Sequence, residues 1–146
     1  MKFESSVIID RPISQVFEFV SDPENDTKWR RGHTRAKRLT PLPAVAGTRC
    51  DETVKAMGME KDLTIEFTEV VPNKRIAFRA TRFGPMEPHG TFGFEVAAGG
   101  TRMTFTAEPK VSGFFRLMTP FMARMGKSDL QQSLAALKAH LESAIK

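Results

Sequence analysis

The last quarter of the chain carries the periodicity that most limits its fold. Apolar side chains recur there at steps of four, three, four and four residues, the spacing of one face of an α-helix; they are Leu130, Leu134, Leu137, Leu141 and Ile145. Polar residues occupy the opposite face. A capping residue followed by proline is typical of a helix start, so we expect a long helix from Thr119-Pro120 onwards. Such a helix needs a large apolar surface to pack against.

A second apolar stripe precedes the first and does not line up with it. Its residues, again at helical steps, are Phe114, Met118, Phe121 and Met125. The five-residue step from Met125 to Leu130 rotates one stripe from the other by roughly 140°. Gly126 lies at the join, where a bend or a close backbone approach costs least. We therefore expect the start of the helix to present Phe and Met to something other than the core under its end.

The residues before this helix form short strands joined by tight turns. Apolar and polar residues alternate, as in half-buried strands, in the segments 3–9, 48–57, 63–71, 76–80, 92–96 and 103–107, and more weakly in the charged segment 33–40. Pro72-Asn73-Lys74 and Ala98-Gly99-Gly100 are turns short enough to join antiparallel neighbours. After the first strand, Arg11-Pro12 and Asp22-Pro23 each predict the start of a short helix.

Length and composition narrow the classes of protein. With 146 residues, we expect 1–146 to be a single domain with its own core. No segment approaches the ~20 apolar residues that span a bilayer, and we find no signal-peptide pattern. The one cysteine, Cys50, has no internal disulfide partner, which fits a cytoplasmic location. The net charge of +5 permits an anionic partner without requiring one.

Several local motifs accompany this order of elements. They are Val7-Ile8-Ile9-Asp10-Arg11-Pro12 with Val16-Phe17, Ser21-Asp22-Pro23 leading to Trp29, Pro41 to Gly47-Thr48, Phe67 to Phe78, Gly100 to Thr104, and Leu134 to Lys138. Together they resemble the START-like, or birch-pollen-allergen-like, superfamily in its polyketide cyclase/dehydratase and lipid transport branch (SRPBCC type). The resemblance implies an α+β helix-grip fold: a curved seven-stranded antiparallel sheet wrapped around a long C-terminal helix, with two short helices between strands 1 and 2. It also implies a cavity for a hydrophobic small molecule such as a lipid, sterol, quinone or polyketide.

The candidate ligand-binding residues are apolar side chains on inward strand faces and on the front of the helix. They are Trp29, Val54, Ile65, Phe67, Phe78, Phe92, Phe94, Phe105, Met118, Phe121, Met122 and Met125. Methionine adapts to ligands of varied shape, and binding sites are mostly apolar with few polar anchors. The alternative is that these side chains fill a closed core, since cores are close-packed. The offset stripe favours the cavity for the helix residues, whereas both interpretations remain open for the strands.

Glu52 is the candidate catalytic residue. Strand alternation places it on the same face as Cys50, Val54 and Ala56. A carboxyl group in an apolar cavity has a raised pKa and can act as a general acid or base. The alternative is a register break, or a rim position in contact with solvent.

Three further residues near strand ends are candidates for the pocket entrance: His33, Arg82 and His89. His140 falls on the polar face of the last helix. No two histidines have the spacing of a metal pair, and a single cysteine cannot form a Cys–Cys metal motif. We therefore expect no metal site and no cofactor.

Six basic residues crowd the segment 28–38: Lys28, Arg30, Arg31, Arg35, Lys37 and Arg38. They fit an anionic partner such as nucleic acid, a membrane surface or an acidic ligand group. They also fit an edge strand whose charge prevents edge-to-edge pairing. Trp29 is the only aromatic residue among them, whereas single-strand binders interleave several, so the edge strand is favoured over nucleic-acid binding.

The leading hypothesis is a cofactor-independent binding protein for a hydrophobic small molecule, either a monomer or a homodimer. The first alternative is a polyketide cyclase/dehydratase-like enzyme, with Glu52 as acid or base and His33 or His89 as second candidates. The second alternative is a protein- or RNA-interaction module that uses the basic segment.

Overall fold

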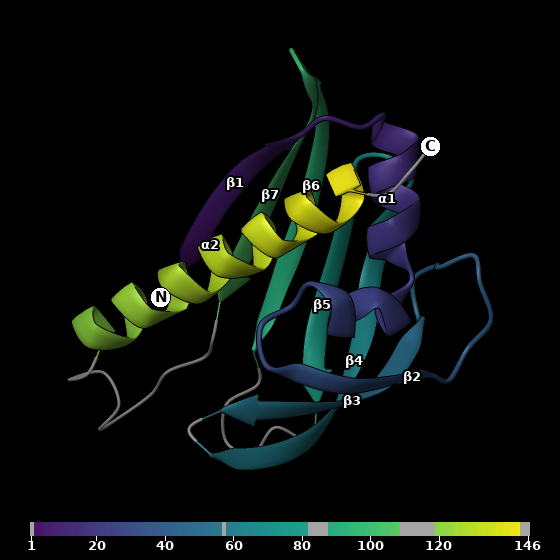
Figure 1. The fold of residues 1–146 in the computed structure, drawn as a ribbon. Helices are drawn as coiled ribbons and strands as arrows, with labels where there is room; N and C mark the ends of the chain where they lie inside the picture. Colours follow the sequence, from purple (N-terminus) through teal and green to yellow (C-terminus); the bar gives the residue numbers. More distant parts are fainter. Residues whose placement is uncertain (1, 57, 82–87, 109–118, 144–146) are drawn as a thin grey trace.

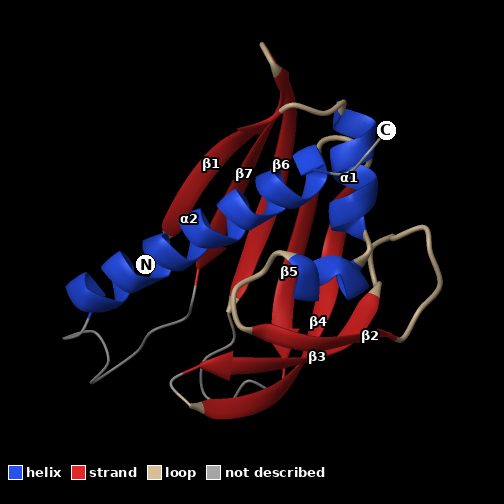
Figure 2. Ribbon diagram, viewed as in Figure 1, coloured by secondary structure: helices blue, strands red, loops and turns tan. Residues whose placement is uncertain are grey.

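The structure, a computed structural model, describes residues 2–56, 58–81, 88–108 and 119–143. Its elements in chain order are β1 (Phe3–Ile9), α1 (Ile13–Ser21), the 3₁₀-helix η1 (Pro23–Lys28), β2 (His33–Arg38), β3 (Arg49–Ala56), β4 (Met59–Val71), β5 (Arg75–Thr81), β6 (His89–Ala97), β7 (Gly100–Glu108) and α2 (Thr119–Ser143). The strands form one sheet in the order β1-β7-β6-β5-β4-β3-β2, and every pair of neighbours is antiparallel (Figures 1 and 2).

Tight turns produce this meander, as the sequence predicts. Asn73 has a φ of 62° in the turn between β4 and β5, and Gly99 and Gly100 have φ values of 88° and 134° between β6 and β7. Asparagine and glycine are the residues that adopt this left-handed region most readily. At Gly100 a side chain is also excluded sterically, because a Cβ there would lie 2.0 Å from the carbonyl oxygen of Ile9.

The long helix α2 lies across the face of the sheet on the side of β1 (Figure 1). Its predicted leucine stripe is buried, with exposed fractions of 6% or less for Leu130, Leu134, Leu137 and Leu141. The helix is continuous through Gly126, where it packs directly on β1. A Cβ at Gly126 would lie 2.4 Å from a ring carbon of Phe3. The predicted join is therefore a close approach between helix and strand.

The expectation that Met125 lines a cavity from the front of α2 is wrong. Met125 is 45% exposed, because the rotation between the two stripes turns it away from the sheet as well as from the leucine face. Met118 and Phe114 lie outside the described residues, as do the side chains of Phe121 and Met122.

The core is aromatic where the sheet faces η1. Phe78, Phe92 and Phe105 contact one another with ring centroids 4.8–6.2 Å apart. Trp29 packs edge-on against two of these rings, at 5.4 Å and 5.8 Å. Phe94, 6% exposed, makes an edge contact with Phe17 of α1.

The expected α+β helix-grip architecture is confirmed by the seven-stranded antiparallel sheet and the long helix α2. The second of the two short helices is a 3₁₀-helix.

Among the helices in the described part of the chain, none combines the length and apolarity needed to cross a membrane.

Candidate functional site

A cavity of about 330 Å³ lies between α2 and the inner face of the sheet. Its apolar walls are formed by Phe3, Val54, Leu63, Ile65, Phe78, Ala80, Pro88, Phe105, Ala107, Gly126 and Leu130. Its polar lining consists of Arg30, Arg31, His33, His89, Asp129 and Ser133. An apolar pocket with a few polar groups is the usual composition of a small-molecule site.

Part of the predicted apolar set lines this cavity: Val54, Ile65, Phe78 and Phe105. Three predicted phenylalanines do not: Phe67, Phe92 and Phe94 are buried at 2%, 1% and 6% exposure but belong to the closed core. Trp29, 3% exposed, is also a core residue. For these four residues the core alternative describes their position.

The remaining predicted positions divide in a similar way. Met125 is exposed and outside the cavity lining. His89 lines the cavity, with its side chain 45% exposed and its Nδ1 3.8 Å from Oε2 of Glu108. Its role at the pocket entrance stays a prediction. Arg82 is outside the described residues, as are Met118 and the side chains of Phe121 and Met122.

The sequence predicts His33 at the pocket entrance. The structure instead places it in the cavity wall, with a side chain only 9% exposed. A β-bulge at the start of β2 accounts for this. His33 is opposite Val54, whereas Arg35 is opposite Thr53, so Thr34 is an extra residue. Without that extra residue, regular pairing would place His33 opposite Lys55, on the outer face. The bulge thus turns His33 inward, beside Glu52.

The carboxyl group of Glu52 is wholly buried and hydrogen-bonded to His33. Nδ1 of His33 lies 2.5 Å from Oε1 of Glu52, and the Glu52 side chain has an exposed fraction of 0%. The inward position predicted from strand alternation is therefore correct, and the solvent-exposed rim position is wrong. Glu52 does not line the cavity itself; His33 stands between the two.

A second buried carboxyl group, Asp26 of η1, completes this cluster. One side-chain nitrogen or oxygen from each of Asp26, His33 and Glu52 lies within 4.8 Å of the other two. Arg30 follows Asp26 by one turn, and its Nη1 lies 3.6 Å from Oδ2 of Asp26. The Arg30 guanidinium also lies over the rings of Phe78 and Phe105, at 5.1 Å and 5.3 Å from their centroids.

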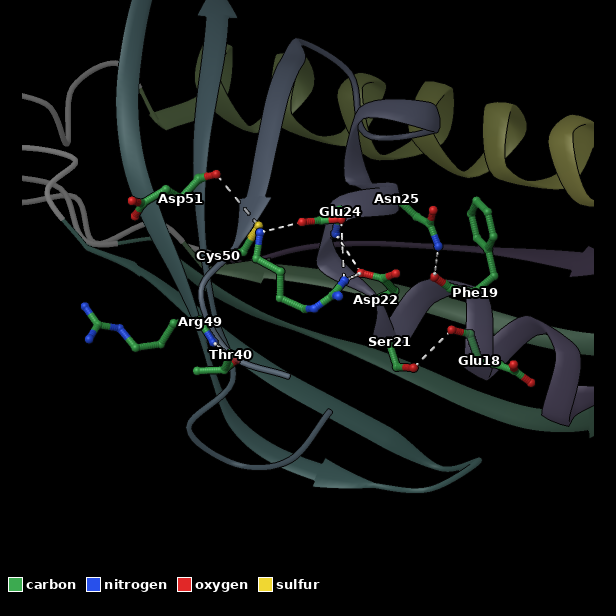
Figure 3. A network of polar contacts seen from close by, with 11 residues as sticks. Glu18, Phe19, Ser21, Asp22, Glu24, Asn25, Thr40, Arg49, Cys50 and Asp51 are labelled. Atoms are coloured by element: carbon green, nitrogen blue, oxygen red, sulfur yellow. Dashed lines mark hydrogen bonds and ion pairs between the residues drawn. The ribbon is translucent and has the colours of Figure 1, made fainter. Parts of the chain in front are cut away.

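Polar contacts cap η1 and tie it to α1 and to β2, which positions Asp26. The side chain of Asp22 accepts a hydrogen bond from the backbone N–H of Glu24, at 3.1 Å, which caps η1. Nδ2 of Asn25 donates to the carbonyl oxygen of Phe19 at 2.9 Å (Figure 3). From β2, Nη1 of Arg38 lies 2.9 Å from Oδ1 of Asp22. The predicted Asp-Pro helix start is thus confirmed, and it is tied to the edge of the sheet.

Burial sets the ionisation of the cluster. Desolvation, followed by the charge of Asp26, raises the pKa of Glu52 to about 10. Burial likewise raises the pKa of Asp26, although the Arg30 charge opposes that shift. Burial and then Arg30 hold the pKa of His33 well below its usual value. At neutral pH, Glu52 is therefore protonated and His33 is neutral.

Among the described residues, two oxygens of this cluster are buried without a hydrogen-bond partner: Oδ1 of Asp26 and Oε2 of Glu52. Two ionised carboxylates offer no donor to each other, whereas a proton on either one supplies it. The raised pKa of Glu52 places such a proton on Glu52, and the two side chains share a hydrogen bond.

The sequence patterns predict neither the burial of Asp26 nor its ion pair with Arg30. Neither residue belongs to a periodic pattern, because a six-residue 3₁₀-helix is too short to show one. Spacing did not reveal the cluster because its members come from three elements: η1, β2 and β3. The Asp22-Pro23 helix start was the one available signal, since it places a polar turn directly before Trp29.

Comparison with known protein families identifies the family of this chain. The family described as "Polyketide cyclase / dehydrase and lipid transport" matches residues 1–142. The chain belongs to this family. The resemblance drawn from the sequence motifs is thereby confirmed. Comparison with curated proteins found no match.

Solved structures with a similar fold come from proteins of low sequence identity. TTHA0849 from Thermus thermophilus is 19% identical with a TM-score of 0.81, covering 99% of this chain and 100% of that one. Ara h 8.0201 is 15% identical with a TM-score of 0.74, covering 99% of each chain. The di-domain ARO/CYC StfQ from the steffimycin biosynthetic pathway is 10% identical with a TM-score of 0.77, covering 94% of this chain and 50% of that one. At these identities the likeness concerns the fold alone.

Proposed function

We propose that this family member binds a hydrophobic small molecule in the cavity between α2 and the sheet. The observation that carries the proposal is the composition of the cavity: apolar walls from five strands, with Arg30 and His33 as inner polar groups. Apolar walls supply affinity, and a small number of buried polar groups orient the ligand. The family description, "Polyketide cyclase / dehydrase and lipid transport", names activities on apolar molecules and supports a ligand of this class.

The cavity favours a compact ligand with one polar group. Its volume of about 330 Å³ is near the lower end of the roughly 300–1,000 Å³ typical of ligand pockets. The Arg30 guanidinium lies over three phenylalanine rings, those of Phe78, Phe92 and Phe105. We infer that the ligand presents an oxygen to Arg30 and its apolar body to Ile65, Phe78 and Phe105.

The basic segment 28–38 supports an anionic partner less well than the cavity supports a small-molecule ligand. Arg30, Arg31 and Arg38 form ion pairs with Asp26, Asp129 and Asp22. Lys28 lies 5.9 Å from the ring centroid of Phe19. Much of the positive charge that the sequence concentrates here is therefore balanced within the fold. A cytoplasmic location and a monomeric or homodimeric state remain predictions.

Binding is tested with the fluorescent probe 1-anilinonaphthalene-8-sulfonate, which combines apolar rings with an anionic group. Ala80 lines the cavity and Ala77 is on the opposite face of the same strand. We expect Ala80→Phe to abolish saturable probe binding and Ala77→Phe to leave it intact, with circular dichroism confirming the fold of both. Should Ala80→Phe fail to fold, Ala80→Leu is the smaller replacement. Unchanged probe affinity in a folded Ala80 variant would contradict the proposal.

Organic extraction of the purified protein, after native mass spectrometry, then gives the chemical class of any bound molecule.

A further inference from the structure

We propose that Asp26, Glu52 and His33 form a proton relay that makes His33 a general base toward the cavity, acting on an apolar weak acid whose anion is delocalised onto oxygen. The inference rests on the proposed function, because the molecule must occupy the same cavity. We call these three residues the relay.

The first argument is the proton count of the relay and Arg30. With both carboxyl groups ionised, Asp26, Glu52, His33 and Arg30 would carry a net buried charge of about −1, which is costly away from water. The buried oxygens Oδ1 of Asp26 and Oε2 of Glu52 would also be left without a donor, although the two side chains are close enough to hydrogen-bond. One proton on Oε2 of Glu52 removes both problems, since it donates to Oδ1 of Asp26 and leaves the four groups neutral.

The position of that proton determines the tautomer of His33. When Glu52 donates through Oε2, its Oε1 is left as an acceptor. The 2.5 Å contact with Nδ1 of His33 then requires a proton on Nδ1. The lone pair of the imidazole is consequently on Nε2. Among the described residues, Nε2 has no hydrogen-bond partner, and His33 is the only member of the relay that lines the cavity.

A divalent metal is the competing occupant of this cluster, and two contacts disfavour it. Nη1 of Arg30 lies 3.6 Å from Oδ2 of Asp26, so a metal bound there would be close to a fixed cation. The distance between His33 and Glu52 is that of a hydrogen bond, which metal ligation by Nδ1 would break. The charge of Asp22 acts on Asp26, although Asp22 is not part of the cluster.

The chemical step is a transfer of one proton with no co-reactant. The X–H bond of the ligand breaks, its proton goes to Nε2 of His33, and its electron pair remains on the ligand. The Nδ1 proton passes to Oε1 of Glu52, and the Oε2 proton of Glu52 passes to Oδ1 of Asp26. The negative charge thus moves from Asp26 to the ligand. Arg30 contacts Asp26 and lines the cavity, so it neutralises that charge before and after the transfer.

The probe for this step is 5-nitrobenzisoxazole, a compact apolar carbon acid. A base removes its C–H proton, the C–H electron pair forms the nitrile, and the N–O bond breaks to leave a phenolate. We expect the wild-type protein to accelerate this elimination with saturation. We expect His33→Ala to reduce the rate roughly 100-fold or more, which is typical for loss of a general base. His140→Ala removes an exposed imidazole outside the cavity and should keep the wild-type rate.

Glu52 and Asp26 are positioning residues, so their test needs a readout beyond rate. Nitrogen-15 NMR of the imidazole should show His33 protonated at Nδ1 and not at Nε2 near neutral pH. Glu52→Gln should keep that tautomer, because its amide oxygen still accepts from Nδ1, yet it should slow the probe reaction by blocking transfer to Asp26. Protonation at Nε2 instead, or an unchanged rate in Glu52→Gln, would overturn the relay.

Two outcomes separate this inference from the proposed function. If 1-anilinonaphthalene-8-sulfonate binds in the cavity but His33→Ala catalyses the elimination of 5-nitrobenzisoxazole as fast as wild type, the relay is wrong and the binding site stands. If neither probe saturates, the proposed function fails with it. A zinc titration decides the remaining alternative: saturable one-to-one binding that is lost in Asp26→Asn would replace the relay by a metal site.

Discussion

Nδ1 of His33 lies 2.5 Å from Oε1 of Glu52, in the buried space between the sheet and η1. Strand pairing alone does not create this contact, because regular pairing would turn the histidine outward. The bulge at Thr34 and the turn at Gly32 bring it in. A local irregularity of an edge strand thus brings a cavity-lining histidine into contact with a buried carboxyl group.

Gly32→Ala should destabilise the fold and disturb His33. Gly32 has a φ of 83°, and a Cβ there would lie 2.8 Å from the carbonyl oxygen of Lys55. The neighbouring hydrogen bond, from the N–H of Lys55 to the carbonyl of Gly32, holds this turn to β3. We expect a loss of about 1–3 kcal/mol in the free energy of unfolding, measured by urea denaturation.

The matched control is Gly47→Ala, which also has a positive φ, 98°, but has no atom within 4 Å of its added Cβ. It should cost less than Gly32→Ala, because only the backbone strain remains. Equal losses in the two variants would show that the contact with Lys55 is unimportant.

Glu52→Gln should change how stability depends on pH. In the unfolded chain Glu52 has its ordinary pKa of 4.5, whereas in the folded protein the pKa is about 10. Between these values the folded state holds a proton that the unfolded state has lost. The free energy of unfolding therefore falls as pH rises, by up to about 1.4 kcal/mol per pH unit. The raised pKa of Asp26 acts in the same direction.

Glutamine carries no ionisable proton, so this variant should lose less stability than wild type between about pH 6 and pH 9. Thermal denaturation across that range measures the difference. The control is Glu60→Gln, an exposed position on β4. If both variants follow the wild-type slope, Glu52 is ionised in the folded protein.

The sequence was sufficient for the elements that rest on periodicity. The leucine stripe of α2 and the inward position of Glu52 follow from spacing alone, and both are confirmed. His33 was misplaced because a bulge breaks the alternation that spacing relies on. Asp26 was missed because its burial depends on how η1 folds over the sheet, a tertiary contact that no local pattern encodes.

Gly126→Ala tests the close contact between α2 and β1. Alanine raises helix propensity by about 1 kcal/mol, yet its Cβ would overlap the ring of Phe3, which lines the cavity. We expect the ring to move into the cavity and the affinity for 1-anilinonaphthalene-8-sulfonate to fall. Ser128→Ala, on the same helix but outside the cavity lining, should leave that affinity unchanged. Tighter or equal binding in Gly126→Ala would show that Phe3 does not shape the cavity.

Arg30→Gln should separate the anionic part of ligand recognition from the apolar part. In wild type the guanidinium is held between Asp26 and the rings of Phe78 and Phe105, so it needs no rearrangement to meet an anion. The variant should bind 1-anilinonaphthalene-8-sulfonate at least about 10-fold more weakly, a loss of about 1.4 kcal/mol. The uncharged analogue N-phenyl-1-naphthylamine should bind both proteins alike. Arg35→Gln, exposed on β2 and outside the cavity lining, controls for the change in net charge. A parallel loss for both probes would mean that Arg30 supports the cavity wall and does not recognise the anion.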